Sequence, residues 1–416
     1  MRQYKDSGVE WIGKIPETWE YKRFKYSGVF EKGKLPDSSN IDKIGLPIIG
    51  ASEMLGKDAR TYTSDSSVPQ CKESDILILW DGANAGITAS GLNGVVSSTA
   101  VKYTCLDKCI LPKYAAYLLK YAEHYFKEKV NGTTIPHMNM AYINDIPLLC
   151  PQIVDQQRIA DYLDEKCGDI DSLIGLQEQM IEKLKAYKQS VITEAVTKGL
   201  DHNAKLVSSG IDWIGEIPEA WSKDKVIRCF SIIGSGTTPK STDDNLFKGD
   251  INWLQSGDIN GGDLFEASKH ISKETLSSYS ALSVYQAPFI IIAMYGASVG
   301  NISISHIDAC VNQACCVMSG CKLDFNYAFY ALKSAKPYLI YRAEGGGQPN
   351  ISQDKIKTLW IPIPPLTEQQ GIASYLDEKC ADIDRLIALK QLKIESLKDY
   401  KKSVIYEAVT GKTIIE

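Results

Sequence analysis

Two stretches of the chain carry the apolar pattern of a long amphipathic helix, with apolar residues at steps of three and four. No proline interrupts either run. The first pattern predicts a helix over about residues 165–197, roughly 50 Å long at 1.5 Å per residue. The apolar positions are Ile170, Leu173, Ile174, Ile181, Leu184, Tyr187 and Val191 in the first stretch, and Ile383, Leu386, Ile387, Ile394, Leu397, Tyr400 and Val404 in the second.

Each of these helices alone would expose a long apolar stripe. Two equal stripes are most easily buried against each other, which predicts a coiled-coil pair. Because each helix follows one globular segment, antiparallel pairing would place the two segments at opposite ends, related by a pseudo-twofold axis. In the alternative interpretation, each helix only covers its own domain.

The segments 20–150 and 222–363 have the short apolar runs of mixed αβ domains. Runs at 75–80 and 289–294 predict buried strands, and each leads into a similar glycine turn, WDGANAG at 80–86 and MYGASVG at 294–300. The predicted fold class is therefore α+β, with two mixed αβ domains separated by a pair of long antiparallel helices.

An internal duplication sets the domain boundaries. SGVEWIGKIPETW at 7–19 returns as SGIDWIGEIPEAW at 209–221, and residues 151–198 match 364–411 at 30 of 48 positions. We assign residues 1–150 and 206–363 to the two domains, and 151–205 and 364–416 to the two helical segments. The interiors of the domains resemble each other only faintly. This indicates a common scaffold that carries two different recognition surfaces, which we call readers.

Tyrosines recur at helical spacing in both domains. Stacking on nucleotides is one interpretation of such a series, but core packing is the usual role of aromatic residues at this spacing. We therefore expect these side chains to be buried: Tyr114, Tyr117, Tyr121 and Tyr125 in the first domain, and Tyr327, Tyr330 and Tyr338 in the second.

Composition and charge narrow the class further. The chain has 416 residues, 44% hydrophobic and 23% charged, with a net charge of −5, and no segment is strongly basic. Contact with nucleic acid would need local patches or a partner that neutralises phosphates. No apolar run reaches the roughly 18 to 20 residues of a membrane span, and the start lacks a signal-peptide pattern, so we expect a cytoplasmic protein.

Catalytic and metal-binding patterns are missing from the sequence. The densest of the 11 cysteines, at 310, 315, 316 and 321, favour buried thiols over a metal site, and no histidine has ligand spacing. The tail at 411–413 imitates the end of a P-loop without its first glycine. The acidic residues Asp164, Glu165, Asp169 and Asp171 are interpreted as a solvated helix beginning.

The chain resembles the specificity subunit of type I restriction-modification systems. The resemblance rests on the W-I-G-x-I-P-E-x-W openings at 11–19 and 213–221, the P-x-x-x-x-Q-Q-x-I-A-x-Y-L-D blocks from Pro151 and Pro364, and the paired helices, and it covers nearly the whole chain. It departs from the pattern in one place, because residues 33–36 read GKLP where the second domain has GTTP at 236–239.

The resemblance implies that two target-recognition domains each read one half of a split double-stranded DNA sequence, with the helices as a ruler. It also implies two methyltransferase subunits and further restriction or motor subunits as partners. No cofactor is expected on this chain, since S-adenosylmethionine, ATP and Mg²⁺ would lie on the partners. No catalytic residue and no metal site is expected.

We expect polar loops at matching places in the two domains to face DNA, with lysines and arginines on phosphates and other side chains on base edges. The first domain would contribute Lys34, Lys57, Arg60, Trp80, Asp81, Asn84, Asn131, Thr133, Thr134 and His137. The second would contribute Thr238, Lys240, Lys248, Tyr295, Ser298, Arg342, Gly346, Gln348 and Asn350.

Two other functions compete with this one. A duplicated scaffold could bind only protein partners, which the acidic balance favours slightly. A nuclease or methyltransferase with a degenerate site is the second alternative, and activity of the purified chain with S-adenosylmethionine or Mg²⁺ would support it.

Overall fold

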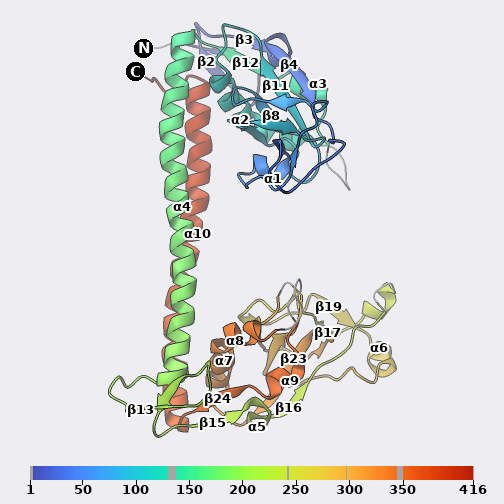
Figure 1. Ribbon diagram of the computed structural model, residues 1–416, viewed down its shortest axis with the longest axis vertical. Coiled ribbons are helices and arrows are strands. Elements are labelled where there is room, and N and C mark those ends of the chain that lie inside the picture. Colours follow the sequence, from blue (N-terminus) through green and yellow to red (C-terminus); the bar gives the residue numbers. More distant parts are fainter. Residues whose placement is uncertain (1–2, 130–136, 241–242, 297, 344–349, 416) are drawn as a thin grey trace. The chain divides into compact units, whose positions relative to one another are not determined.

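The computed structural model describes residues 3–129, 137–240, 243–296, 298–343 and 350–415. It divides into two compact units, residues 1–178 with 391–416 (unit 1) and residues 179–390 (unit 2). Each unit holds one mixed αβ domain together with one end of each long helix (Figure 1). We describe each unit separately.

The domain of unit 1 is built from short strands, α-helices and a 3₁₀ turn. Its strands are β1 (Tyr4–Asp6), β2 (Lys14–Pro16), β3 (Glu20–Arg23), β4 (Gly28–Lys32), β5 (Leu46–Ile49), β6 (Tyr62–Thr63), β7 (Gln70–Cys71), β8 (Ile76–Leu79), β9 (Thr88–Ser90), β10 (Gly94–Val96), β11 (Ala100–Cys105) and β12 (Pro147–Cys150). Its helices are η1 (Phe24–Tyr26), α1 (Ala51–Met54), α2 (Pro112–Lys129) and α3 (Met140–Asn144), the first being a 3₁₀ turn.

The domain of unit 2 has the same kinds of element in a similar order. Its strands are β13 (Leu206–Ser208), β14 (Glu216–Pro218), β15 (Ser222–Lys225), β16 (Phe230–Gly234), β17 (Ile251–Leu254), β18 (Asp263–Leu264), β19 (Lys269–Ile271), β20 (Phe289–Ala293), β21 (Ile302–Ser305), β22 (Cys310–Val311), β23 (Cys315–Cys321) and β24 (Trp360–Ile363). Its helices are α5 (Val226–Cys229), η2 (Asp244–Phe247), α6 (Lys273–Ser278), α7 (Phe325–Ser334), α8 (Lys336–Tyr341) and α9 (Gln353–Lys357).

The central sheets of the two domains share one topology. Unit 1 has the strand order β4-β11-β8-β9, and unit 2 has β16-β23-β20-β21 with β18 added at the edge. The predicted buried strands are β8 and β20, whose side chains are all buried. In both units a neighbouring sheet contains a parallel pair, β5 with β10 and β17 with β22. The duplication expected from the repeats is thus present in the fold.

The long helices are α4 (Ile153–Lys198) and α10 (Leu366–Val409). α4 begins about twelve residues before the start that the apolar pattern predicted. Lys401 Nζ lies 2.7 Å from an Asp171 carboxylate oxygen in unit 1, and Lys188 Nζ lies 2.6 Å from Asp384 in unit 2. Residue numbers rise along α4 as those of the partners fall along α10, so the helices are antiparallel, as predicted.

The apolar stripe of each long helix is only partly buried, which corrects the prediction that the two stripes bury each other. Ile170, Ile181 and Val191 are buried, whereas Leu173 is 46% exposed and Tyr187 is 58% exposed. The reason is that the stripe is wider than the contact with one neighbouring helix requires, so its far edge faces solvent.

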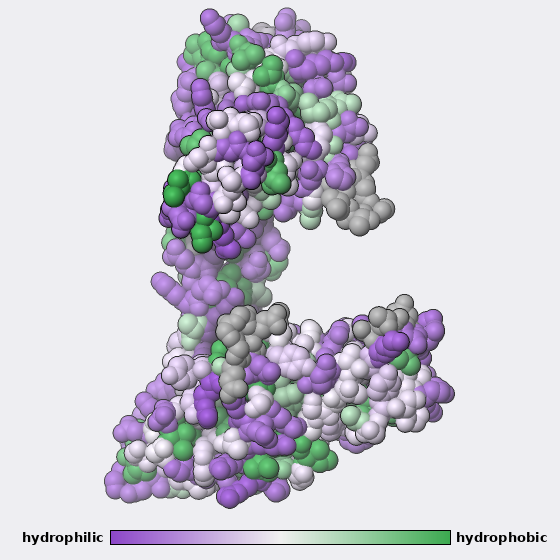
Figure 2. Space-filling model, turned by 45° about the vertical axis from the view of Figure 1, so that its right-hand side comes forward, coloured by the Kyte–Doolittle hydropathy of each residue, from purple (hydrophilic) through white to green (hydrophobic). Residues whose placement is uncertain are grey.

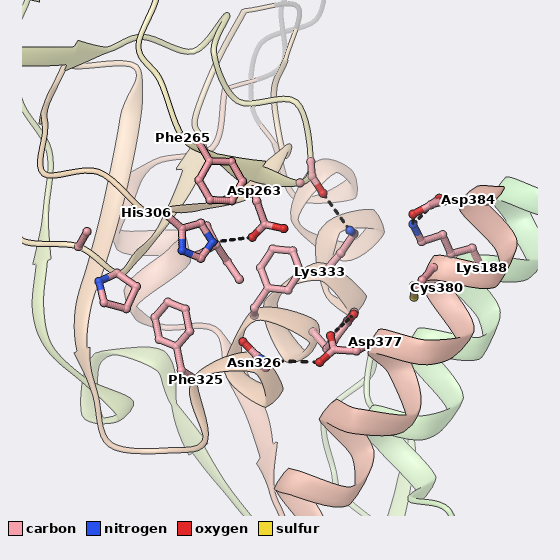
Figure 3. A pocket seen from close by; sticks show the side chains of 18 residues that line it. Lys188, Asp263, Phe265, His306, Phe325, Asn326, Lys333, Asp377, Cys380 and Asp384 are labelled. Carbon is pink, nitrogen blue, oxygen red and sulfur yellow. Dashed lines mark hydrogen bonds and ion pairs between the residues drawn. The ribbon is translucent and has the colours of Figure 1, made fainter. Parts of the chain in front are cut away.

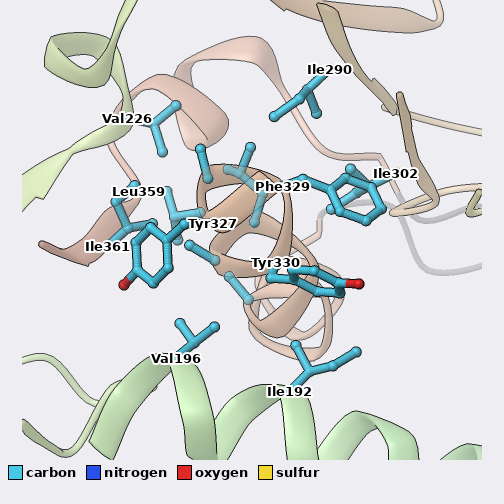
Figure 4. Packing of buried hydrophobic residues seen from close by; sticks show 14 of the residues in the cluster. Ile192, Val196, Val226, Ile290, Ile302, Tyr327, Phe329, Tyr330, Leu359 and Ile361 are labelled. Atoms are coloured by element: carbon cyan, nitrogen blue, oxygen red, sulfur yellow. The ribbon is translucent and has the colours of Figure 1, made fainter. Parts of the chain in front are cut away.

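Both ends of the helix pair also enter the domain cores, so each helix contributes to the domain of either unit. In unit 2, Ile192 and Val196 of α4 point toward Tyr327 and Tyr330 of α7 (Figure 4). In unit 1, Leu163 of α4 is fully buried in the corresponding core. The tyrosines Tyr114 and Tyr327 are completely buried, which confirms their predicted core role.

The repeated openings cover the C-terminal ends of the two helices. Gly411 follows α10 with φ +70°, and a Cβ there would lie 2.6 Å from Pro16 and 2.9 Å from Trp19. Gly199 follows α4 with φ +77° and lies equally close to Trp221. The glycines both permit the left-handed turn and leave room for the tryptophans. Each repeated opening therefore packs over the C-terminal end of one long helix and seals it from solvent.

The repeated glutamines have a structural role as well. In unit 1, buried Gln156 donates to the Pro151 carbonyl and accepts from the Leu111 amide, each at 2.9 Å. In unit 2, Gln369 donates to the Pro364 carbonyl and accepts from the Asp324 amide, each at 2.8 Å. Each glutamine thus ties the beginning of a long helix to the loop that precedes α2 or α7.

Candidate nucleic-acid interface

The two glycine turns have matching backbone hydrogen bonds. In unit 1 the Gly86 amide donates to the Leu79 carbonyl at 2.8 Å, and in unit 2 the Gly300 amide donates to the Ala293 carbonyl at 2.8 Å. All four outer glycines of these turns, Gly82, Gly86, Gly296 and Gly300, have φ between +75° and +92°. Such angles are costly for other residues, which explains the shared spacing.

Two further segments meet each turn in the same way. The amide of Trp80 donates to the Thr99 carbonyl at 2.8 Å, as that of Met294 does to Ala314 at 2.7 Å. The Trp80 carbonyl accepts from the Met138 amide, and the Met294 carbonyl accepts from the Ile351 amide. Residues 137 and 350 therefore have equivalent places beside the turns.

The glycine openings also correspond, despite the departure from the family pattern. A Cβ on Gly33 would lie 2.3 Å from the Val96 carbonyl oxygen, and one on Gly236 would lie 1.8 Å from that of Val311. Both residues must be glycine because the backbone of β10 or β22 passes directly over them. GKLP in unit 1 thus holds the place of GTTP in unit 2.

The segments of unit 1 bring charged side chains together in loop cluster 1, which we define as Lys32, Lys34, Trp80, Asp81 and His137. His137 Nδ1 lies 2.6 Å from Asp81 Oδ1, and Lys32 Nζ lies 3.7 Å from Asp81 Oδ2. The same ammonium group lies 5.3 Å from the Trp80 ring centroid. Four of the five members were predicted, and Lys32 was not.

The equivalent segments of unit 2 form loop cluster 2, which we define as Thr238, Tyr295, Gln313 and Asn350. The Thr238 hydroxyl donates to Gln313 Oε1. Burial raises the pKa of the Tyr295 hydroxyl, and a hydrogen bond with Gln313 partly offsets this. Gln313 was missed because a glutamine after a short apolar run has no local signal. All members of this cluster are neutral.

The other predicted residues have different surroundings. Asn84 and Ser298 are in the glycine turns, where their carbonyls accept from Ile87 and Asn301. Lys57 and Arg60 are exposed on the loop between α1 and β6 and form no ion pair within the described residues. Asn131, Thr133, Thr134, Gly346 and Gln348 lie outside the described residues.

Each of the other predicted cations of unit 2 has a neighbour in the same unit. The amide of Lys240 donates to the Tyr279 hydroxyl at 3.1 Å, and Lys248 Nζ donates to Asn245 at 3.0 Å. The Arg342 guanidinium lies over the Tyr338 ring at 5.6 Å. All three side chains are exposed, so their charges remain accessible.

A pocket occurs at the junction of domain and helices in each unit, with a volume of about 860 Å³ in unit 2 and 520 Å³ in unit 1. In unit 2 the Tyr330 hydroxyl donates to Asp377 at 2.8 Å, beside the Lys188–Asp384 pair (Figure 3). Lys333 lines the same pocket, and burial lowers its pKa.

The pocket of unit 1 repeats these contacts and corrects the interpretation of the acidic cluster. Tyr117 donates to Asp164 at 2.7 Å, and Asp171 pairs with Lys401. Because α4 begins at Ile153, these carboxylates lie inside the helix, and they join it to α2 and α10 instead of favouring its dipole. We interpret the repeated pockets as structural features of the junction between each domain and the two long helices, which together form the frame of the molecule.

The described surface is mostly hydrophilic on the face that Figure 2 shows, with apolar residues in small separate patches. Among the described residues no group of histidine, cysteine or acidic side chains could hold a metal ion, and no helix is long and apolar enough to cross a membrane. Burial raises the pKa of Cys316 to about 12 and of Cys310 to about 11, so these thiols are un-ionised near neutral pH.

Two equivalent scaffolds that present loop clusters of different chemistry define a recognition protein with two reading surfaces. The family model of the type I restriction modification DNA specificity domain matches the chain twice, at residues 16–186 and 219–399. The chain therefore belongs to the type I restriction-modification specificity family. Its function is DNA sequence recognition in such a system, and catalysis lies on partner subunits.

Relatives of the chain carry the same description. A type I restriction enzyme MjaVIII specificity subunit of Methanocaldococcus jannaschii is 28% identical, over 99% of this chain and 97% of the relative. The EcoBI specificity subunit of Escherichia coli is 24% identical, over 89% of this chain and 81% of the relative. Because members of this family recognise DNA, neither a scaffold that binds only proteins nor an enzyme with a degenerate site is favoured for this chain.

A solved structure supports the fold. Its title describes complex assembly and conformational transition of the type I R-M system, and one of its chains superposes with a TM-score of 0.69 at 15% identity. The match covers 96% of this chain and 99% of the other.

Proposed function

We propose that the chain reads a bipartite DNA sequence, with loop cluster 1 on one half-site and loop cluster 2 on the other. The observation that carries this proposal is that the two clusters share their backbone hydrogen bonds and differ in side-chain chemistry. A charged cluster and a neutral cluster present different donors and acceptors to base edges, so they select different sequences.

Exposed cations of the two domains serve as phosphate contacts in this proposal. They are Lys57, Arg60, Lys240, Lys248 and Arg342. Phosphate contacts position a protein on the duplex without selecting a sequence. Since the whole chain has a net charge of −5, these few residues neutralise little of the DNA charge, and partner subunits supply the rest.

The exposed edge of the helix stripe is the proposed docking surface for those partners. Leu173, Leu176 and Tyr400 are about half exposed in unit 1. Tyr187, Leu386 and Leu389 have the equivalent places in unit 2 and are exposed to a similar extent. Two equivalent patches fit two copies of one partner, which we propose to be the methyltransferase subunit, with restriction or motor subunits joining afterwards.

We place the remaining chemistry on those partners. S-adenosylmethionine would be held by the methyltransferase subunits, and ATP and Mg²⁺ by the motor subunits, while this chain binds no cofactor. The complex would act in the cytoplasm, where the DNA lies.

Methylome sequencing of a host that expresses the chain with its methyltransferase subunit tests the proposal. The expected result is one bipartite motif, with a modified adenine and a fixed gap between two unlike halves. Methylation at a single continuous motif would contradict the reading of two half-sites. Native mass spectrometry of the same complex should give two methyltransferase subunits per chain, and a single copy would contradict the docking proposal.

A further inference from the structure

Gln313 stands at the tip of the turn between β22 and β23, at the centre of loop cluster 2. The backbone on both sides of it is fixed, because the Asn312 amide donates to the Leu254 carbonyl at 2.9 Å and the Ala314 carbonyl accepts from Met294 at 2.7 Å. The buried Asn312 side chain also accepts from the Ala314 amide at 3.0 Å. Gln313 itself is exposed.

Two side chains of loop cluster 2 interact with the amide group of Gln313. Its Oε1 accepts the Thr238 hydroxyl proton, which identifies the oxygen end of the amide. Its other contact is Tyr295, whose pKa the hydrogen bond lowers. The hydrogen bond from Thr238 therefore fixes the oxygen end of the amide, and Tyr295 lies beside it.

At least one donor and one acceptor of this amide remain free. A glutamine side chain has two N–H donors and two oxygen lone pairs, and Thr238 uses one of the lone pairs. In the major groove adenine offers the N6 donor beside the N7 acceptor, which complements such an amide in a bidentate pair. Guanine offers two acceptors, and cytosine a single donor, so neither satisfies both groups.

We propose that Gln313 is the specificity-determining residue by which unit 2 reads an adenine in its half-site, with Thr238 and Tyr295 as positioning residues. This inference rests on the proposed function. It goes beyond it by naming one residue, one base and the groove from which the base is read.

Unit 1 differs at the equivalent position. The matching hydrogen bonds of Trp80 and Met294 with Thr99 and Ala314 place Ser98 where unit 2 has Gln313. A serine hydroxyl pairs with several bases and selects weakly. Unit 1 therefore lacks this glutamine contact, and its half-site supplies an internal reference for an experiment.

The test uses the complex of the full chain with its methyltransferase subunit, and DNA duplexes in which each position of the two half-sites is varied in turn. Gln313→Ala should reduce the preference for adenine at one position of one half-site by about 5- to 150-fold, which converts the 1–3 kcal/mol of a bidentate pair. Gln313→Glu should move the preference at that position toward cytosine, because a carboxylate accepts from cytosine N4.

Two further variants separate positioning from folding. Thr238→Val keeps the Gln313 side chain but removes the hydroxyl that donates to its Oε1. It should therefore weaken the preference for adenine at the same position and at no other. Gln370→Glu, an exposed residue of α10 with the same change of charge, should leave both half-sites unchanged. Because the two domains have separate cores, a unit 2 variant that misfolds would lose every position of its own half-site, whereas loss of one contact changes a single position.

The possible failures are distinct. If the unmodified complex shows no sequence preference, the proposed function is wrong. If that complex reads a bipartite site and Gln313→Ala leaves every position unchanged, or weakens all positions equally, the assignment of Gln313 is overturned while the proposed function stands.

Discussion

At the scale of residues, loop cluster 1 is an exposed ion-paired group whose importance for stability should be small. The Asp81 and His137 side chains are 26% and 57% exposed, and Lys32 is 51% exposed. Exposed pairs of this kind contribute about 0 to 1 kcal/mol. Their arrangement is thus more useful for presenting charged donors and acceptors than for holding the domain together.

Asp81→Asn should therefore change recognition with little loss of stability. The neutral side chain no longer attracts the Lys32 ammonium group and presents an amide in place of the carboxylate, so the half-site read by unit 1 should become degenerate while the other half stays intact. Methylome sequencing measures the first effect, and thermal unfolding should show a shift of at most a few degrees.

A matched control exists in unit 2. Asp263 forms an exposed pair with His306 at 2.8 Å that lies outside loop cluster 2. Asp263→Asn should leave both half-sites unchanged. If it alters recognition as much as Asp81→Asn does, the special role of loop cluster 1 is refuted.

At the scale of elements, apolar burial holds each helix end in its domain, and ion pairs contribute less. Leu163 of α4 and Leu376 of α10 are both fully buried and equivalent in the repeat. Asp171 and Asp384, which pair across the helices, are 59% and 58% exposed.

Leu163→Ala and Leu376→Ala should each lower the free energy of unfolding by about 2 to 5 kcal/mol, because each leaves a cavity. Asp171→Ala and Asp384→Ala should lower it by at most about 1 kcal/mol, and less at high salt. Chemical denaturation of the four variants tests this. Equal losses for leucine and aspartate variants would contradict the ranking.

The structure also changes where the helices should be lengthened. An insertion near Ala195, in the last turns of α4, would disturb the core of unit 2, because Ala195 is buried there beside Val191 and Val196. The boundary between the units, after residue 178 in α4 and after residue 390 in α10, avoids both cores.

Paired insertions of one heptad at these two places should lengthen each helix by about 10 Å. Because about 10 base pairs of B-DNA span 34 Å, the gap in the recognised motif should grow by about three base pairs. Sequencing of the methylated motif measures the gap. An unchanged gap would reject the ruler role of the helices.

At the scale of the whole molecule, the two domains depend on a common frame and have separate cores. Each core includes one end of α4 and one end of α10. A transplanted domain must therefore match the helix residues on which it packs, and the repeated blocks ensure that relatives share many of them.

Replacing residues 20–150 with those of a relative should change one half-site and leave the other unchanged. The openings and the helix pair stay in place, so Trp19 still seals the end of α10 and the frame persists. Methylome sequencing of the chimaera provides the measurement. A change in both halves would show that the domains do not read independently.

The sequence predicted the repeated domains and the two long helices better than it predicted the side chains that meet in the loop clusters. The two long helices, the buried strands and the glycine turns follow from local patterns. The duplication follows from the match of 7–19 with 209–221 and of 151–198 with 364–411. The extent of helix burial was mispredicted at Leu173 and Tyr187, since a stripe on a helix does not indicate how wide its partner is. The beginning of α4 was placed too late for a similar reason, because its first turns pack on the domain.

Local periodicity and the placement of glycine therefore determined, from the sequence alone, that this protein is a repeated frame with two readers. Only the tertiary structure decided what each reader presents. Thr238, Tyr295 and Gln313 come from segments far apart in the chain, as do Lys32 and His137, and they meet because separate strands end at one edge of a domain. Such a meeting depends on the packing of the whole domain, which no single segment of the sequence encodes.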